Sequence, residues 1–171
     1  MQVKSTRFGQ FEVPEEKVLT FPDGLLGFEA SKRFVILDHA PETPFKWLQS
    51  VDDPDLAFVI INPAEFMPDY AVELGRDDVV KLGLKDASEA AVYVVVVIPE
   101  DPSAMTANLQ GPLVVNAERR LGRQVVLADG RYRTRHPILA ELQSARAAEP
   151  SGKAKPRAKA GSRGPAVALA R

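Results

Sequence analysis

The sequence predicts a mostly β protein: a compact antiparallel barrel-like or sandwich single domain with few short helices and a disordered basic carboxy-terminal tail. Short runs of aliphatic and β-branched residues recur along the chain, and turns rich in Pro, Gly and Asp separate them. Helical periodicity is scarce, and strands do not alternate with helices as they would in a Rossmann-like sheet. A length of 171 residues suits one domain with a substantial core.

The amino-terminal part predicts three short strands. Residues 6–13 alternate aromatic and polar side chains, with Gly9 as a candidate bulge. Residues 17–21 form a second run, which ends at the turn Pro22-Asp23-Gly24. Residues 33–37 form a third apolar run.

The next segment predicts a hairpin. Residues 45–49 alternate as in a strand with one buried face, and residues 56–61 are a β-branched run typical of a strand buried on both faces. The acidic turn 52–55 between them contains Pro54, which fixes φ, and Asp side chains that can bond nearby backbone N–H groups.

The later part predicts a central strand and a second pair of strands. Residues 91–98 are apolar on both faces, and Pro99 ends the run. Residues 113–116 and 124–127 predict two strands around a turn at Leu121-Gly122.

Three short helical segments are expected. Residues 64–66 predict a single turn, and residues 77–83 predict about two turns that begin with acids and end at a Gly. Residues 138–148 predict a short amphipathic helix after Pro137.

Charge divides the chain into an acidic body and a basic tail. Residues 151–171 contain six Lys and Arg and no acid, so residues 1–150 carry a net charge of −7, against −1 for the whole chain. An acidic body disfavours direct binding to nucleic acid and favours a basic protein partner. The tail composition buries too little apolar surface to repay ordering, so we expect a domain at 1–145 and a disordered tail at 146–171.

The composition also indicates the compartment. The chain has no cysteine, so disulfides and thiolate metal sites are excluded. No signal peptide is visible, and the longest apolar run, residues 90–98, is far shorter than the roughly 20 residues of a membrane span. We expect a cytoplasmic protein and a monomer.

No pattern predicts catalysis, a cofactor or a metal. The two histidines, His39 and His136, have no ligand partners at metal-binding spacing, and Pro54 interrupts the acids that a calcium loop would need. No Ser lies in a Gly-x-Ser-x-Gly elbow, and no Gly-Lys-Ser/Thr follows the Gly-containing turns. We therefore expect a protein that is not an enzyme.

Two segments are candidate binding surfaces. The cluster Phe66-Met67-Pro68-Asp69-Tyr70 joins aromatics and Met, which protein interfaces favour, around a rigid Pro. The segment 108–112 carries side-chain amides that can pair with a partner's backbone. For each single residue, packing in the core is an equal alternative; across both segments together, an interface is favoured.

A series of motifs stands in order along the chain from about Val3 to Leu139 and ends before the tail. The motifs are Phe8-Gly9, residues 21–29, Leu48-Gln49-Ser50, residues 57–60, Asn62-Pro63, Pro68-Asp69-Tyr70, residues 107–116, residues 122–127 and residues 132–137. In order and spacing this series resembles the flagellar assembly factor FliW family.

The resemblance implies a compact antiparallel β fold with no known catalytic site. It also implies two protein partners: flagellin, bound in the cytoplasm at its helical terminal region, and the translational regulator CsrA, a small dimeric RNA-binding protein that represses flagellin synthesis. A partner switch would follow, in which export of flagellin frees the factor to antagonise CsrA.

Together the candidate segments and the resemblance predict a set of partner-binding residues. They are Asn62, Phe66, Met67, Asp69, Tyr70, Asp77, Asp78, Asn108, Gln110, Arg135 and His136. An alternative from another class is a β-barrel nucleic-acid-binding module that uses the basic tail.

Overall fold

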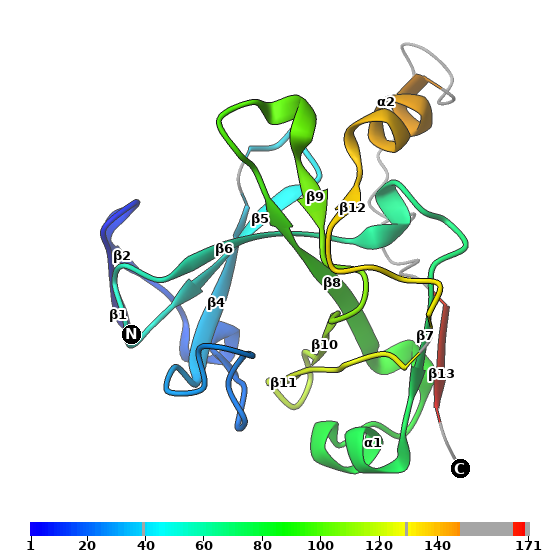
Figure 1. Ribbon diagram of the computed structural model, residues 1–171. Coiled ribbons are helices and arrows are strands. Elements are labelled where there is room, and N and C mark those ends of the chain that lie inside the picture. Colours follow the sequence, from blue (N-terminus) through cyan, green and yellow to red (C-terminus); the bar gives the residue numbers. More distant parts are fainter. Residues whose placement is uncertain (39, 129, 148–165, 170–171) are drawn as a thin grey trace.

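The computed structural model describes residues 1–38, 40–128, 130–147 and 166–169 (Figure 1). Seven strands of this described part form a closed ring. They are β3 (Leu19–Thr20), β4 (Arg33–Asp38), β5 (Phe45–Ser50), β6 (Ala57–Ile61), β8 (Ala90–Val97), β10 (Leu113–Asn116) and β11 (Leu121–Gln124). β8 closes the ring because it pairs with both β6 and β10. The predicted barrel-like β fold is confirmed, and its pairs are antiparallel except for β11 with β3.

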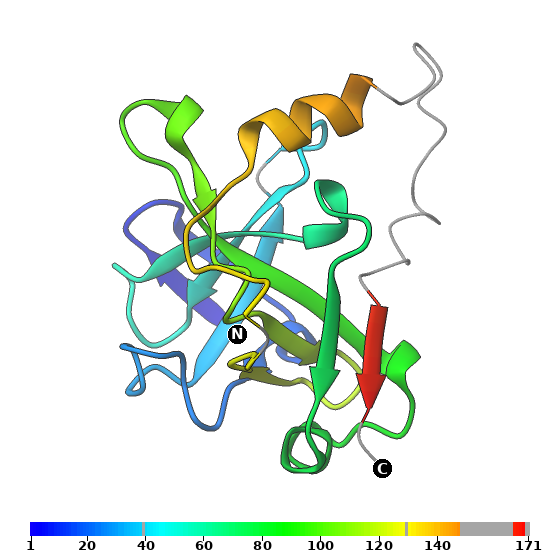
Figure 2. The same ribbon diagram turned by 45° about the vertical axis from the view of Figure 1, so that its right-hand side comes forward.

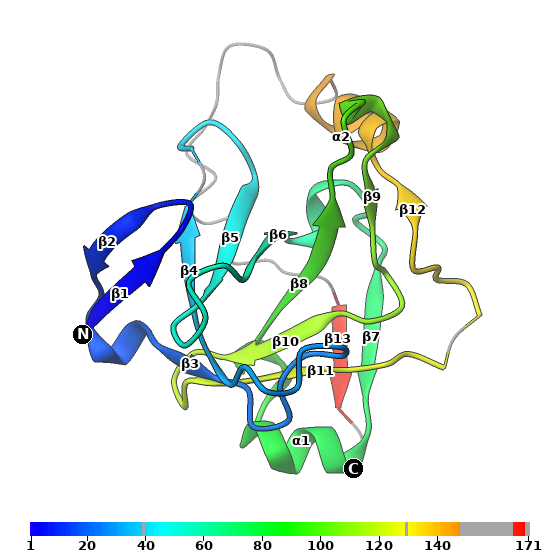
Figure 3. The same ribbon diagram turned by 60° about the vertical axis from the view of Figure 1, so that its left-hand side comes forward.

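Further strands lie outside the ring. The hairpin of β1 (Gln2–Ser5) and β2 (Gly9–Glu12) packs at one side of the barrel (Figure 3). β9 (Thr106–Ala107) pairs with the end of β8 and with β12 (His136–Pro137). β7 (Ala71–Leu74) pairs with β13 (Ala166–Leu169) in a separate two-stranded parallel sheet.

Helices are few and short, as the sequence predicts. The α-helices are α1 (Arg76–Leu82) and α2 (Leu139–Ala147), and the 3-10 turns are η1 (Glu15–Lys17), η2 (Pro63–Glu65), η3 (Ala87–Glu89) and η4 (Pro102–Ala104). α1 ends where Gly83 adopts the left-handed conformation at φ 64°, which glycine tolerates without strain.

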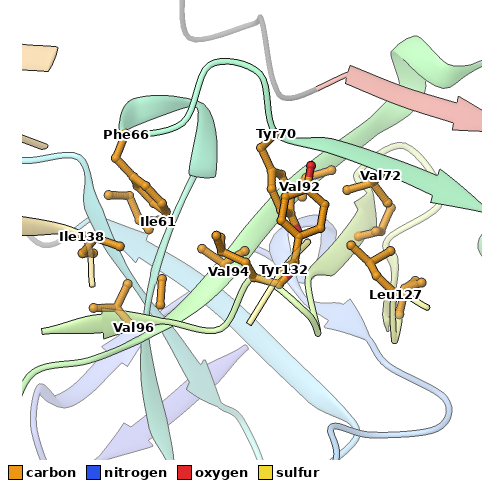
Figure 4. Close-up of a cluster of buried hydrophobic side chains, with 14 of the residues drawn as sticks. Ile61, Phe66, Tyr70, Val72, Val92, Val94, Val96, Leu127, Tyr132 and Ile138 are labelled. Carbon is orange, nitrogen blue, oxygen red and sulfur yellow. The ribbon is translucent and has the colours of Figure 1, made fainter. Parts of the chain in front are cut away.

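β8 separates two hydrophobic clusters, because successive side chains of a strand point to opposite faces. Val92, Val94 and Val96 belong to the larger cluster (Figure 4). Tyr93 and Val95 point the other way and pack against the second cluster, which contains Phe21, Phe34 and Leu48. The prediction that this strand is apolar on both faces is confirmed.

The predicted turn at Leu121-Gly122 is wrong, since both residues belong to β11. The chain reverses just before them, where Arg120 adopts φ 57° and the Asn116 Oδ1 accepts the N–H of Arg119. Gly122 is required for another reason: its Cα lies against the ring of Phe21, which leaves no room for a Cβ atom.

Two other expectations change at the amino terminus. The single strand predicted over residues 6–13 is the second half of the β1–β2 hairpin, and Gly9 begins β2 at φ 75°. The strand predicted over residues 17–21 is reduced to β3, because η1 takes up Lys17.

Two elements lie in the part of the chain that was expected to be tail. α2 continues to Ala147, two residues past the expected domain end at 145, and Ala166–Leu169 form β13. The division at 145 stays a prediction. The rest of the predicted tail, 148–165 and 170–171, lies outside the described residues.

Candidate functional site

The aromatic loop that follows η2 is anchored in the core. The Oδ1 of Asn62 accepts the N–H of Ala64 at 2.9 Å and so starts the 3-10 turn. Phe66 is 3% exposed and Tyr70 is 0% exposed, and both lie in the larger hydrophobic cluster (Figure 4). Of the two alternatives for these aromatics, the structure selects core packing. Their prediction as exposed partner anchors is wrong, because β8 and the chain around Tyr132 cover them.

Tyr70 fixes the loop to its neighbours through both its ring and its hydroxyl. The O–H donates a hydrogen bond to the carbonyl oxygen of Leu109 at 2.6 Å, and the ring lies 4.6 Å from that of Tyr132. Burial, with a smaller contribution from Tyr132, raises the pKa of Tyr70. The neutral hydroxyl is therefore retained well above neutral pH.

The residues around these anchors do reach the surface. Asp69 and Arg135 are exposed, and Asn62, Met67 and His136 are half-buried. The ring of His136 stacks over Phe66 with a centroid distance of 6.2 Å, and its Nε2 contacts the Oε1 of Glu141 on α2. We call Asn62, Met67, Asp69, Arg135 and His136 the η2 surface.

The amides of the segment 108–112 shape their own loop. The Oδ1 of Asn108 accepts the backbone N–H groups of Gln110 at 3.1 Å and Gly111 at 2.9 Å. Both predicted residues, Asn108 and Gln110, are half-buried. The Tyr70 hydrogen bond to Leu109 holds this loop beside the aromatic loop, so the structure brings the two predicted segments together.

Asp77 and Asp78 belong to a network of charges on and beside α1. Arg123 of β11 donates from Nε to the Oδ1 of Asp78 at 2.7 Å and from Nη1 to the Oδ2 of Asp23, and its Nη2 lies 3.8 Å from the Oδ2 of Asp77. Lys81 lies 3.5 Å from Asp77 and 3.7 Å from Asp23. Partial burial acts to lower the pKa of Arg123, but Asp78 and Asp23 raise it overall. We call these five residues the α1 network.

Four residues of the α1 network line a surface hollow of about 430 Å³: Asp23, Asp78, Lys81 and Arg123. Two aliphatic side chains at this hollow, Leu26 and Val126, are 60% and 61% exposed. Arg123, Leu26 and Val126 were not predicted as parts of a surface. Arg123 is 100 residues from Asp23, so no local pattern signals their contact.

The described residues contain no group of three or more His, Asp or Glu side chains that could hold a metal ion. His39 lies outside the described residues. Among the helices that the structure describes, none is long and apolar enough to cross a membrane.

The fold and these surfaces define a small β-barrel protein with an ion-paired hollow beside α1 and a loop surface beside η2. Comparison with known families identifies it further: the model of the FliW protein family matches residues 2–138. The chain belongs to the FliW family, as the motifs in its sequence predict.

Similar proteins share this family along most of their length. A flagellar assembly factor FliW from Geobacter sulfurreducens is 46% identical over 147 residues, which are 86% of this chain and 92% of the relative. Another, from Natranaerobius thermophilus, is 43% identical over 139 residues, or 81% of this chain and 92% of the relative. These matches place the chain among flagellar assembly factors, whose name denotes a role in assembly and no reaction.

A solved structure supports the same placement. The crystal structure of a flagellar assembly factor FliW superposes with a TM-score of 0.74 at 36% identity, and the match covers 80% of this chain and 96% of the other. The barrel described above is therefore the fold of this family.

Proposed function

We propose that this chain is a non-enzymatic factor that binds flagellin in the cytoplasm and antagonises the translational regulator CsrA. It would thereby couple flagellin synthesis to export: bound flagellin occupies the factor, and export releases the factor to act on CsrA. The observation that carries the proposal is the family match over residues 2–138. We propose further that the factor acts as a monomer, without a cofactor and without direct contact between its folded domain and nucleic acid.

The charge of the body supports a basic partner. Residues 1–150 carry a net charge of −7, and a protein that binds RNA presents positive charge to the phosphate backbone. Complementary fields accelerate and orient association between two such proteins. We assign the CsrA contact to the α1 network, where the side chain of Asp77 is 74% exposed and that of Asp78 is 18% exposed.

The η2 surface is our candidate for flagellin. Met67 gives this surface a flexible apolar group, and Arg135 and Asp69 add opposite charges that are exposed. Such a mixture suits the side of an amphipathic helix laid across it. Phe66 and Tyr70 support this surface from beneath, so replacing them with Ala would test folding rather than contact.

Calorimetric titration of the purified chain against flagellin, and separately against CsrA, tests the proposal. We expect binding near one-to-one with flagellin and competition between the two partners. A folded chain that gives no heat and no co-elution with either partner would reduce the family match to a shared fold.

Two single substitutions test the surfaces. Met67→Ala is expected to weaken flagellin binding by about fivefold or more, which corresponds to about 1 kcal/mol. Asp77→Lys is expected to weaken CsrA binding and to leave flagellin binding unchanged. Glu100→Lys, at an exposed acid outside both surfaces, is the matched control for charge. An equal effect of Asp77→Lys and Glu100→Lys would remove the assignment to α1.

The nucleic-acid alternative rests on the tail alone. It requires RNA affinity that falls steeply with salt and disappears when the tail charges are removed. Substitution of Lys153, Lys155, Arg157 and Lys159 by Gln is a sharper test than deletion of 151–171, because deletion would also remove β13. Salt-dependent RNA binding by the intact chain, lost in this variant, would favour the alternative.

A further inference from the structure

The partner strand of β7 is β13, formed by residues 166–169. The register runs from Ala71 with Ala166 to Leu74 with Leu169, and the two strands lie side by side in parallel, green and red in Figure 2. In the described residues β7 pairs with no strand other than β13. The family match ends at residue 138, and β13 begins 28 residues later. Within the matched family domain, the described part of the chain therefore leaves β7 as an edge strand.

The surface that receives β13 is both a strand edge and an apolar face. Val167 and Leu169 are half-buried and pack against the larger core cluster, which contains Val72 and Leu74 of β7. Ala168, between them, is exposed. β13 also lies against η3. The apolar face thus selects aliphatic side chains at alternate positions, and the backbone of β7 supplies the pairing.

An unpaired strand edge beside an apolar face is the usual setting for strand addition. Backbone hydrogen bonds supply affinity, and alternate side chains supply selectivity. The seated segment shows which chemistry fits: small, β-branched, small, then Leu, running parallel to β7.

We propose that the β7 edge is a docking site for an extended aliphatic segment of a partner protein, and that residues 166–169 of this chain close the site as a built-in competitor. The competitor belongs to the same chain, so its binding at the β7 edge is intramolecular and is favoured over binding of a separate segment. A partner segment must therefore bind the β7 edge more strongly than residues 166–169 do, or bind when these residues are detached from β7. This regulation is independent of whether flagellin or CsrA is the partner.

The test uses the full-length chain and a fluorescein-labelled synthetic peptide with the sequence of residues 164–170. Val167→Asp with Leu169→Asp places charges against the larger core cluster and should release β13. Ala168→Asp, at the exposed position between them, is the matched control. We expect fluorescence anisotropy to show peptide binding at least tenfold tighter in the double variant than in the unaltered chain or the control.

Hydrogen exchange supplies the second measurement. The β7 amides of Val72 and Leu74 are expected to exchange faster in the double variant and to regain protection when the peptide is added. A peptide carrying Asp at the positions of Val167 and Leu169 should not bind.

Three results would overturn the proposal. Faster exchange without peptide binding would make β13 a structural strand only. Equal peptide binding by all three proteins would show that the tail does not close the edge. A dimer of the unaltered chain in sedimentation, absent from the double variant, would assign the β7 edge to a second copy of this chain.

Discussion

Tyr70→Phe separates the structural role of the aromatic loop from a role in binding. The substitution keeps the ring that packs 4.6 Å from Tyr132 and removes the hydroxyl that donates to Leu109 at 2.6 Å. Because Tyr70 is 0% exposed, water cannot replace the lost donor. The free energy of unfolding should fall by about 1–3 kcal/mol, which is the cost of a lost hydrogen bond with a buried carbonyl oxygen left unpaired.

Urea denaturation followed by tryptophan fluorescence measures this change. The midpoint should fall at constant m-value, and the melting temperature should fall by about 2–4 °C for each kcal/mol. Asp69→Asn, at the exposed neighbour, is the control and should change stability by less than about 0.5 kcal/mol. The flagellin affinity of Tyr70→Phe, measured at a temperature where this variant is folded, should stay unchanged. Unchanged stability together with weaker flagellin binding would refute the assignment of Tyr70 to the core.

Three further predictions concern other parts of the barrel. Gly122→Ala should cost about 1–3 kcal/mol of stability, because the new methyl group must displace the buried ring of Phe21; thermal unfolding checks this, and an unchanged melting temperature would contradict the packing. Arg123→Met should lower the free energy of unfolding by about 1–3 kcal/mol, because it leaves Asp78 without its ion pair. Urea unfolding measures this loss, and an unchanged midpoint would show that water replaces the guanidinium. Stability should fall as pH rises above about 10, because the raised pKa of Tyr70 keeps it neutral in the folded protein while it ionises in the unfolded chain. Tyr70→Phe should lessen that fall, and an identical alkaline profile in both proteins would count against it.

Local patterns predicted most of the strands because burial alternates along them. The runs at 33–37, 45–49, 56–61 and 91–98 all form strands within one or two residues of their predicted bounds. Helix α1 was predicted for a similar reason, since acids at its start and Gly83 at its end are local signals. The misplaced turn at Leu121-Gly122 shows the limit: a glycine signals both a turn and a close approach, and only the position of Phe21 distinguishes them.

Polar residues in strands show the same limit. Gln49 ends a run whose alternation predicts a strand with one buried face, and this polar residue is itself 0% exposed. Its Oε1 accepts the hydroxyl of Ser5, 44 residues away, and its Nε2 donates to the carbonyl oxygen of Leu56 at 3.1 Å. A buried amide is stable because these partners satisfy it, and the distant Ser5 cannot be inferred from spacing.

For the candidate site, the sequence located the segments and left the orientation of their side chains open. The aromatic loop offered core packing and interface use as equal alternatives, and the cluster on one face of β8 selected the core for Phe66 and Tyr70. The acids of α1 were identified as candidates, but their pairing with Arg123 was not. Exposure depends on what covers a residue, and the covering elements lie far away in the sequence.

The sequence by itself determined the family, the predominance of β structure and the opposite charges of body and tail. Each of these depends on residue type, order or local period. Only the tertiary structure decided how β8 closes the barrel, which aromatics are buried, how Asp23 and Arg123 meet, and that Ala166–Leu169 lies beside β7. These are contacts between residues far apart in the chain, and their free energy depends on geometry that no local pattern encodes.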